Sequence, residues 1–261
     1  ADRYPLLDSL PGKGVVGVCE QATHSGDAPK VLELAHRYPW VVAAVGIHPE
    51  SLLPAADCGE EGPAPTVSVY GGDWAAEMRA LAPYYEDPKV VAVGECGLDY
   101  HWPEPKPALQ KQWFRRQIEL AKEVKLPIIV HSRDAAEPTM QIIQETKAYE
   151  CGGVIHCYSY SPEMAEEYVK MGFFIGMGGV LTFKNAKKLV RCAERIPLSS
   201  IVLETDCPYM APEPNRGKRN DSSQLIYVAQ KLAEIKGITA EEVKQVTTEN
   251  AHRLYRLTQN K

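Results

Sequence analysis

Apolar and polar segments follow one another along the chain in a regular order. A short run rich in valine, isoleucine and glycine is followed by a polar turn and then by an amphipathic stretch. This order is typical of βα units built around a parallel sheet. The apolar runs predict seven strands, at Gly14–Glu20, Val41–Pro49, Val90–Asp99, Leu126–Arg133, Gly153–Ser159, Gly172–Gly178 and Ile201–Asp206.

These runs are almost continuously apolar, as expected for strands that are covered on both faces. The tail Asp221–Leu257 is predicted to be helical, with a break at Gly237 and an N-cap at Thr239. The segment Asp2–Leu10 is predicted to form a helix, because it has few β-branched residues. Two stretches between strands repeat apolar residues at helical spacing, namely Leu109, Trp113, Leu120 and Val124, and Ala186, Leu189, Val190 and Ala193.

The alternation predicts an α/β fold of the TIM-type (β/α)8 barrel class, in which eight strands are needed for closure. The sequence supplies seven, so we expect the first barrel strand to be absent from the chain as given and to precede Ala1. A length of 261 residues matches one such barrel, and residues 1–261 are predicted to form a single domain. The irregular stretch Ser51–Asp73 is expected to be a disordered flap rather than an ordered lid.

Composition narrows the class of protein. The formal net charge of -5 argues against a protein that coats nucleic acid, because that mode needs many contacts from lysine and arginine to phosphate. The seven cysteines include no C-x-x-C pair, which favours a reducing cytoplasm over a disulfide framework. No apolar stretch approaches the ~20 residues that cross a bilayer. We therefore expect no membrane partner, and nothing indicates an obligate protein partner.

Ionisable side chains stand where the predicted strands end. In a parallel barrel the C-terminal ends of the strands converge on one mouth, where the loops build the active site. The residues at these ends are His48, Glu95, His131, Arg133, His156, Glu204 and Asp206.

The residue types at these ends predict a divalent metal site. Side chains two apart on a strand face the same way, so Glu204 and Asp206 point together. Carboxylates and imidazoles that share one mouth would repel or remain costly to desolvate unless a cation lay between them. Nucleophilic catalysis is disfavoured, because there is no G-x-S-x-G elbow and neither Cys96 nor Cys207 has a dedicated base. The remaining histidines are expected to have structural roles, namely His24, His36, His101 and His252.

Five short motifs resemble, in order and approximate spacing, those of the TatD-type metal-dependent deoxyribonucleases, which belong to the amidohydrolase-like barrels. The resemblance covers about Gly14 to Leu257, and a later segment, Pro212–Asn220, is similar to the basic loop of that family. The motifs are Gly46-Ile47-His48-Pro49, Gly94-Glu95-Cys96-Gly97-Leu98-Asp99-Tyr100, His131-Ser132-Arg133, His156-Cys157-Tyr158-Ser159 and Glu204-Thr205-Asp206-Cys207-Pro208.

The resemblance implies hydrolysis of phosphodiester bonds in DNA, including 3′-to-5′ exonuclease action on single strands, with two divalent cations per chain. It implies that Glu95 bridges the two cations and that His131 and His156 bind one of them. Asp206 would bind the other cation and act as the base for the attacking water. Such a pair of cations can generate hydroxide near neutral pH and stabilise the attacking and leaving oxygens.

The resemblance to this family also implies residues that contact the substrate. By the resemblance, His48, Arg133 and Glu204 line the phosphate pocket. Mg²⁺ is the expected metal, with Mn²⁺ or Zn²⁺ as alternatives, because carboxylates favour the first two and imidazoles admit the third. The cations of the basic loop that could hold a nucleic-acid backbone are Arg216, Lys218 and Arg219.

The chain departs from the family at its start. The family carries a His-x-His pair at the end of its first strand, and nothing before His24 can take that part. Strand counting points to the same gap. Two alternatives to a deoxyribonuclease stay open: a barrel hydrolase of a small lactone, amide or phosphoester, and a non-catalytic remnant that lost its activity with that strand.

Overall fold

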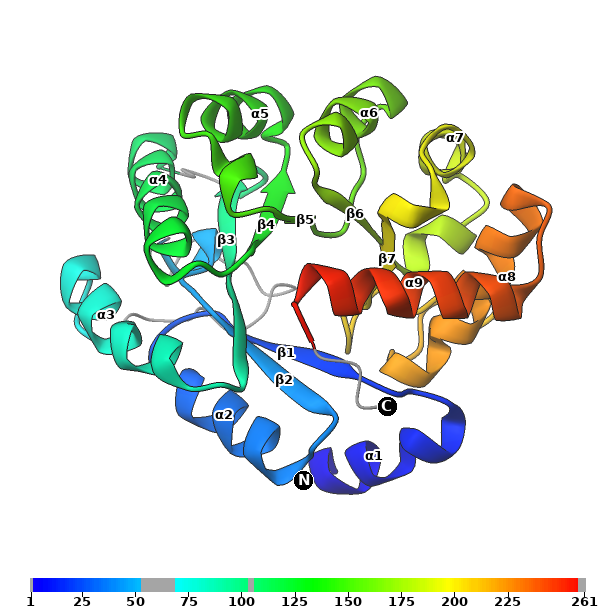
Figure 1. The fold of residues 1–261 in the computed structure, drawn as a ribbon, viewed down its shortest axis with the longest axis horizontal. Coiled ribbons are helices and arrows are strands. Elements are labelled where there is room, and N and C mark those ends of the chain that lie inside the picture. The colour runs from blue at the N-terminus through cyan, green and yellow to red at the C-terminus, as the bar shows by residue number, and fades with distance from the viewer. Residues whose placement is uncertain (1, 53–68, 103–105, 258–261) are drawn as a thin grey trace. The chain divides into compact units, whose positions relative to one another are not determined.

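The computed structural model describes residues 2–52, 69–102 and 106–257. The chain divides into two compact units, which we describe separately. Unit 2 comprises Cys19–Val154, and unit 1 comprises Ala1–Val18 together with Ile155–Lys261. Both divisions fall within strands, at β1 and β5 (Figure 1). The single-domain hypothesis stays a prediction.

Unit 2 contains a parallel sheet with a helix after almost every strand (Figure 1). The strands β2, β3 and β4 pair in chain order, and Gly97 of β3 lies opposite His131 of β4. The helix α4 packs against β3, and α2 packs against β2. The elements are β1 (Val18–Ala22), α2 (Ala28–Arg37), β2 (Val41–Val45), η2 (Pro49–Leu52), α3 (Trp74–Leu81), η4 (Ala82–Glu86), β3 (Val90–Asp99), α4 (Pro107–Val124), β4 (Ile128–Arg133), α5 (Ala136–Glu145), η5 (Ala148–Glu150) and β5 (Gly153–Ile155).

Unit 1 contains the parallel pair β6 and β7, with α9 packed against β7. Asn250 of α9 donates from Nδ2 to the carbonyl oxygen of Ile201, over 2.6 Å, and so fixes the start of β7. The elements are α1 (Arg3–Ser9), η1 (Pro11–Lys13), α6 (Pro162–Lys170), β6 (Phe174–Met177), η6 (Gly179–Thr182), α7 (Lys187–Arg195), η7 (Leu198–Ser200), β7 (Ile201–Leu203), η8 (Ser222–Gln224), α8 (Leu225–Lys236) and α9 (Ala240–Leu254).

The predicted order of strands is confirmed, since the described residues hold seven strands in the predicted places. The first was placed too early: it begins at Val18, because Gly14 has a φ of 84° and closes the turn of η1. The strands β2, β5, β6 and β7 end earlier than predicted, and β2, β5 and β7 end before the polar residues that were expected at their ends. Within Ser51–Asp73, residues 53–68 lie outside the described part of the chain, so the flap prediction is not tested.

The predicted helices are confirmed. The segments expected near both ends of the chain form α1, α8 and α9. Gly237 ends α8 in the left-handed conformation, and the Thr239 side chain accepts a hydrogen bond from the Glu242 amide at the start of α9. The two stretches with apolar residues at helical spacing form α4 and α7.

Two buried glutamines of α4 hold the ends of two strands. They lie seven residues apart, about two turns, and therefore share one face of the helix. Gln117 accepts the Ile47 N–H at 2.7 Å and donates to the Ile47 carbonyl at 3.0 Å. Gln110 binds Asp99 in the same way, at 2.7 and 2.8 Å. Each side chain thus satisfies both the N–H and the C=O of one backbone residue. For Gln117 this residue is Ile47, which directly precedes His48.

Replacing Gln117 by leucine is expected to lower the free energy of unfolding by about 2 kcal/mol, because the Ile47 N–H and C=O would stay buried without partners. Gln112, on the exposed face of the same helix, provides the matched control. Gln112→Leu is expected to change the free energy of unfolding by less than about 0.5 kcal/mol. Urea denaturation of both variants measures the difference, and equal midpoints would show that the bonds to Ile47 contribute nothing.

Candidate metal centre

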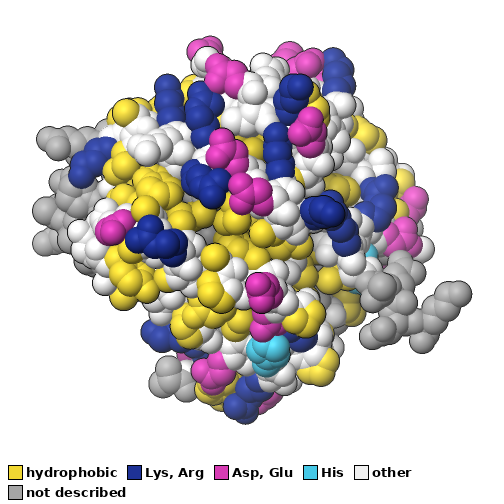
Figure 2. All heavy atoms as spheres, turned by 60° about the vertical axis from the view of Figure 1, so that its left-hand side comes forward, with side chains coloured by type: hydrophobic (Ala, Val, Ile, Leu, Met, Phe, Trp, Pro, Cys, Tyr) yellow, Lys and Arg dark blue, Asp and Glu magenta, His cyan; other side chains and the backbone are white. Residues whose placement is uncertain are grey.

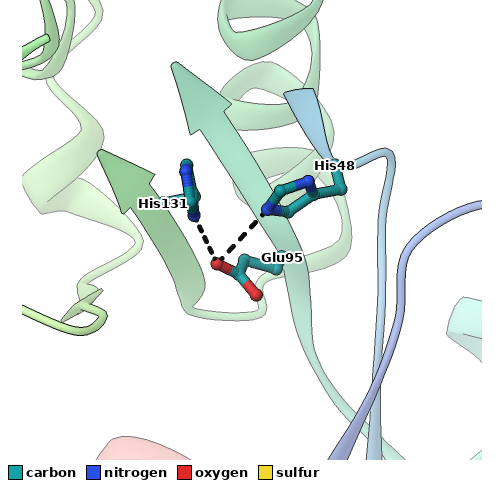
Figure 3. Close-up of side chains that lie close together, drawn as sticks. All are labelled: His48, Glu95 and His131. Atoms are coloured by element: carbon teal, nitrogen blue, oxygen red, sulfur yellow. Dashed lines mark hydrogen bonds and ion pairs between the residues drawn. The ribbon is translucent and has the colours of Figure 1, made fainter. Parts of the chain in front are cut away.

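Three side chains from three consecutive strand ends meet in unit 2 (Figure 3). His48 follows β2, Glu95 lies within β3 and His131 lies within β4. Glu95 Oε1 is 2.9 Å from His131 Nδ1 and 3.6 Å from His48 Nε2. Each side chain is less than one-fifth exposed, at 11% for His48, 12% for Glu95 and 17% for His131. The carboxylate therefore faces both imidazoles from one side, in a partly enclosed position.

This group fits a divalent cation. The three candidate ligand atoms lie within 4.8 Å of one another, and no other group of this kind occurs in residues 2–52, 69–102 and 106–257. Imidazole nitrogen and carboxylate oxygen are ligands of Zn²⁺, Mn²⁺ and related ions. The residues that present them could hold one cation and leave further positions open for water and substrate.

Asp99 supports this group from behind, and our sequence analysis did not identify it. Its side chain is fully buried, and its Oδ2 lies 2.8 Å from His131 Nε2. Its Oδ1 accepts the His101 N–H at 2.9 Å. A histidine that ligates a metal through one ring nitrogen commonly binds a carboxylate through the other, which fixes the orientation of the ring. A signal existed, because Glu95, Gly97 and Asp99 alternate and so face the same side of β3.

Both carboxylates act on the charge of His131. Burial alone lowers the pKa of the imidazolium, but the hydrogen bonds and negative charges of Asp99 and Glu95 outweigh it and raise the pKa from 6.5 to about 9. Burial raises the pKa of Asp99, and the hydrogen bond and positive charge of His131 more than offset this, so the pKa of Asp99 is lowered. Without a metal, His131 therefore carries a proton at neutral pH.

Binding of a divalent cation at neutral pH is expected to release about one proton, because His131 must lose its proton to become a ligand. Calorimetric titration with Mn²⁺ in buffers of different ionisation enthalpy measures the number released. In the metal-free protein, the stability that the protonated histidine contributes is complete below pH 6.5 and is lost as the pH rises through about 9. Proton release that stayed near zero across buffers would contradict the assignment of His131 as a ligand.

A second group of ionisable residues lies in unit 1, around His156. The imidazole is 7% exposed and forms ion pairs through both nitrogens. Nδ1 binds Glu204 Oε2, and Nε2 lies 3.4 Å from Asp206 Oδ1. The Cys157 N–H donates to Glu204 at 3.2 Å. Glu204 Oε1 is buried and has no hydrogen-bond partner in the described residues, so it is free to accept a ligand or a proton. Asp206 is the most exposed of the three, at 44%.

The groups around His131 and His156 have the same arrangement, because each of these histidines has a carboxylate at both ring nitrogens. Glu204 contacts His156 through one carboxylate oxygen, as Asp99 contacts His131. His48 lies among the possible ligand atoms of unit 2. That Glu204 and His48 line the phosphate pocket stays a prediction. The hypothesis that Glu95, His131, His156 and Asp206 bind one pair of cations joins residues of both units and stays a prediction.

The predicted substrate cations have individual contacts. Arg133 is exposed and lies over the Trp102 ring, with Cζ 5.5 Å from its centre. Arg216 lies over Phe183 at 4.4 Å. Arg219 forms an exposed ion pair with Asp2. Lys218 is exposed as well. None of these contacts tests whether the side chain binds DNA.

Cysteine chemistry is disfavoured, as expected from the sequence. Cys96 is fully buried, and burial raises the pKa of its thiol far above the usual range. Its Sγ lies 3.7 Å from the Ile129 carbonyl oxygen. A thiol in this setting cannot supply a thiolate at neutral pH. Neither Cys96 nor Cys192, which are both buried, forms a disulfide.

Parallel βα units that carry imidazoles and carboxylates at the ends of their strands define a metal-dependent hydrolase. The sequence model of one family, TatD related DNase, matches residues 2–256. The chain therefore belongs to the TatD family. None of the described helices is long and apolar enough to cross a membrane.

Known proteins similar to this chain agree with that family. An uncharacterized metal-dependent hydrolase of Bacillus subtilis is 45% identical over 228 residues, covering 87% of this chain and 82% of the relative. Human deoxyribonuclease TATDN3 is 34% identical over 263 residues, covering 97% and 89%. The crystal structure of a TatD homologue from Escherichia coli matches with a TM-score of 0.86 and 29% identity, covering 98% of this chain and 93% of that one. The fold is accordingly the TIM-type barrel fold of the TatD structures.

Proposed function

We propose that the chain hydrolyses phosphodiester bonds of DNA, by 3′-to-5′ exonuclease action on single strands. The main support is the group in which Glu95 faces both His48 and His131, with the ligand atoms close enough to share one cation. Further support comes from the human relative of this chain, which is named a deoxyribonuclease. We also propose two cations per chain, with Mg²⁺ as the physiological metal.

The candidate residues would act either as metal ligands or as the base for the attacking water. In unit 2, His48, Glu95 and His131 would hold one cation. In unit 1, His156 would contribute a ligand to the other cation through Nε2, because Glu204 occupies its Nδ1. A bound divalent cation polarises the phosphoryl oxygen and makes a nearby water more acidic. Asp206, the most exposed carboxylate of its group, would accept the proton of the attacking water.

Other side chains would keep the ligands and the substrate in place. Asp99 would hold the ring of His131, and its own carboxylate is kept in position by the His101 N–H. Arg133 and the loop cations Arg216, Lys218 and Arg219 would contact the phosphates, replacing their counterions. We further propose a cytoplasmic location, which the odd number of cysteines and the lack of a C-x-x-C pair support, because a disulfide framework is typical of oxidising compartments.

Digestion of end-labelled oligonucleotides tests this proposal. The chelated protein is reloaded with Mg²⁺, Mn²⁺ or Zn²⁺ and given single strands labelled at either end, the matching duplex, and a panel of small lactones, amides and phosphoesters. Stepwise loss from the 3′ end of the single strand, only after metal is restored, is the expected result. If a small ester is hydrolysed while the DNA stays intact, the protein is better described as a small-molecule hydrolase. If metal binds and no substrate is hydrolysed, the result favours a non-catalytic remnant.

A further inference from the structure

The helix α7 and the residues before it carry an unusual concentration of positive charge. Residues 184–195 include five lysines and arginines and one glutamate, although the whole chain has a net charge of -5. On the face drawn in Figure 2, by comparison, cationic and anionic side chains are mixed. Leu189, Cys192 and Ala193 are buried and anchor α7. The charged residues therefore lie on the opposite, solvent-facing side of the helix.

Most of these cations are not neutralised by neighbours. Arg195 forms ion pairs with Glu163 and Glu166. The others form no ion pair with any residue that the structure describes; Lys187 and Arg191 lie about one turn apart on α7, Lys188 lies beside Lys187, and Lys184 precedes the helix. These unpaired cations are Lys184, Lys187, Lys188 and Arg191.

Three of these cations, Lys184, Lys187 and Arg191, line a hollow, which we call the α7 groove. It has a volume of about 460 Å³ and lies between η6, α7 and α8. Its apolar lining includes Phe183 and Val190, and its cationic lining includes Lys184, Lys187, Arg191 and Lys231, of which Lys231 forms an ion pair with Glu234. One carboxylate, that of Glu194, also lines it, so positive charge predominates. A second hollow of about 640 Å³ shares Lys187 and Arg191 with it and adds Lys188. A surface with cations along its sides and apolar groups between them suits a flexible polyanion that also carries flat, apolar groups.

The α7 groove begins beside the candidate catalytic residues of unit 1. Gly178, just before η6, has no room for a side chain, because a Cβ atom would overlap Glu204 Oε1. Thr182, at the end of η6, accepts the Glu213 N–H through Oγ1 at 2.8 Å. Phe183 follows directly, with the Arg216 guanidinium over its ring. The groove thus starts at the carboxyl ends of β6 and β7, the ends at which Glu204 and Asp206 lie.

We propose that the α7 groove binds the sugar–phosphate backbone of single-stranded DNA as it leads away from the phosphate to be cut. Lys184, Lys187 and Arg191 would each contact a successive phosphate, and the stacked pair of Phe183 and Arg216 would offer a flat surface to a base. This inference rests on the proposed function. It predicts that substrates several nucleotides long bind more tightly than a dinucleotide, which would reach only the cut site.

A pair of charge-matched variants tests the α7 groove. Lys187→Glu/Arg191→Glu reverses two groove cations, and Lys170→Glu/Lys244→Glu makes the same change in net charge on α6 and α9 of the same unit. Both are prepared with Glu95→Gln to prevent cleavage, in the presence of Mg²⁺. Fluorescence anisotropy with a labelled dinucleotide and a long oligothymidylate, over a range of salt concentrations, gives affinity and salt dependence without turnover.

For the long oligonucleotide, the groove variant is expected to bind roughly tenfold more weakly, and its salt slope should fall by about 1.4 for two lost phosphate contacts. Affinity for the dinucleotide should stay unchanged, and the control variant should match the parent. Equal losses in both variants, or an unchanged salt slope in the groove variant, would overturn the inference. The anisotropy assay measures binding without turnover, so it tests the α7 groove alone. Failure of the proposed nuclease activity would be seen in the digestion assay, where the DNA would stay intact.

Discussion

Replacing Glu95 by glutamine is expected to reduce hydrolysis by about 10³-fold while leaving the fold intact. The amide keeps the size of the side chain but removes the negative charge that faces His48 and His131. A neutral amide is a weaker ligand, and a loss of about 4 kcal/mol in stabilisation by the metal corresponds to that reduction in rate. Because glutamine has almost the same size and shape as glutamate, folding should tolerate the exchange.

The variant is compared with Glu137→Gln, which makes the same exchange at an exposed position of α5 in the same unit. Single-turnover rates on DNA, affinity for Mn²⁺ and thermal unfolding of both proteins are measured. Glu137→Gln should match the parent in all three. Turnover near that of the parent in Glu95→Gln would rule out a role for this carboxylate at the metal, whatever the affinity of the protein for DNA.

The position of Glu95 and its histidines could be predicted from the sequence for a definite reason. Each stands where a continuous apolar run meets a polar residue, and the parallel order of strands brings these points to one edge. Glu95 and His131 lie in the neighbouring strands β3 and β4, and His48 lies three residues after the end of β2. Pairing of neighbouring strands therefore brings these three side chains to one edge of the sheet.

The role of Asp99 was not predictable in the same way. Whereas Glu95 interrupts the apolar segment, Asp99 comes at the end of the whole segment, where a polar residue is an ordinary boundary of a strand. Its bond to His131 depends on the register that sets Gly97 opposite His131, and an apolar pattern does not specify register between parallel strands that are buried on both faces. The alternation of Glu95, Gly97 and Asp99 gave the direction of the side chain but not its partner.

The buried glutamines of α4 show a second limit. A helical pattern assigns polar residues to the exposed face, and Gln110 and Gln117 would be placed there by default. Both are buried, because the strand ends at Asp99 and Ile47 leave backbone N–H and C=O groups that a helix side chain must satisfy. The need for a partner arises only once the strands are in place, so the hydrophobic pattern of the helix alone does not reveal it.

Replacing Gly97 by alanine is expected to lower the free energy of unfolding by about 2 to 5 kcal/mol. A Cβ atom at this position would overlap the carbonyl oxygen of His131 on the neighbouring strand. The residue also has a φ of 148°, which side chains rarely adopt. Overpacking costs about 1–3 kcal/mol and the backbone strain a further 1–2 kcal/mol, which is a large part of the stability of a typical domain.

Gly152→Ala separates these two causes. Gly152 has a φ of 72° but nothing within 4 Å of its Cβ position, so its alanine variant should lose only the 1–2 kcal/mol of strain. Urea denaturation gives the stabilities, and titration with Mn²⁺ gives the metal affinity of the folded protein. Gly97→Ala should also bind metal about tenfold more weakly, because separating β3 from β4 moves His131 away from Glu95. Unchanged metal affinity in a destabilised Gly97→Ala would mean that the close approach of the two strands serves folding alone and does not position the ligands.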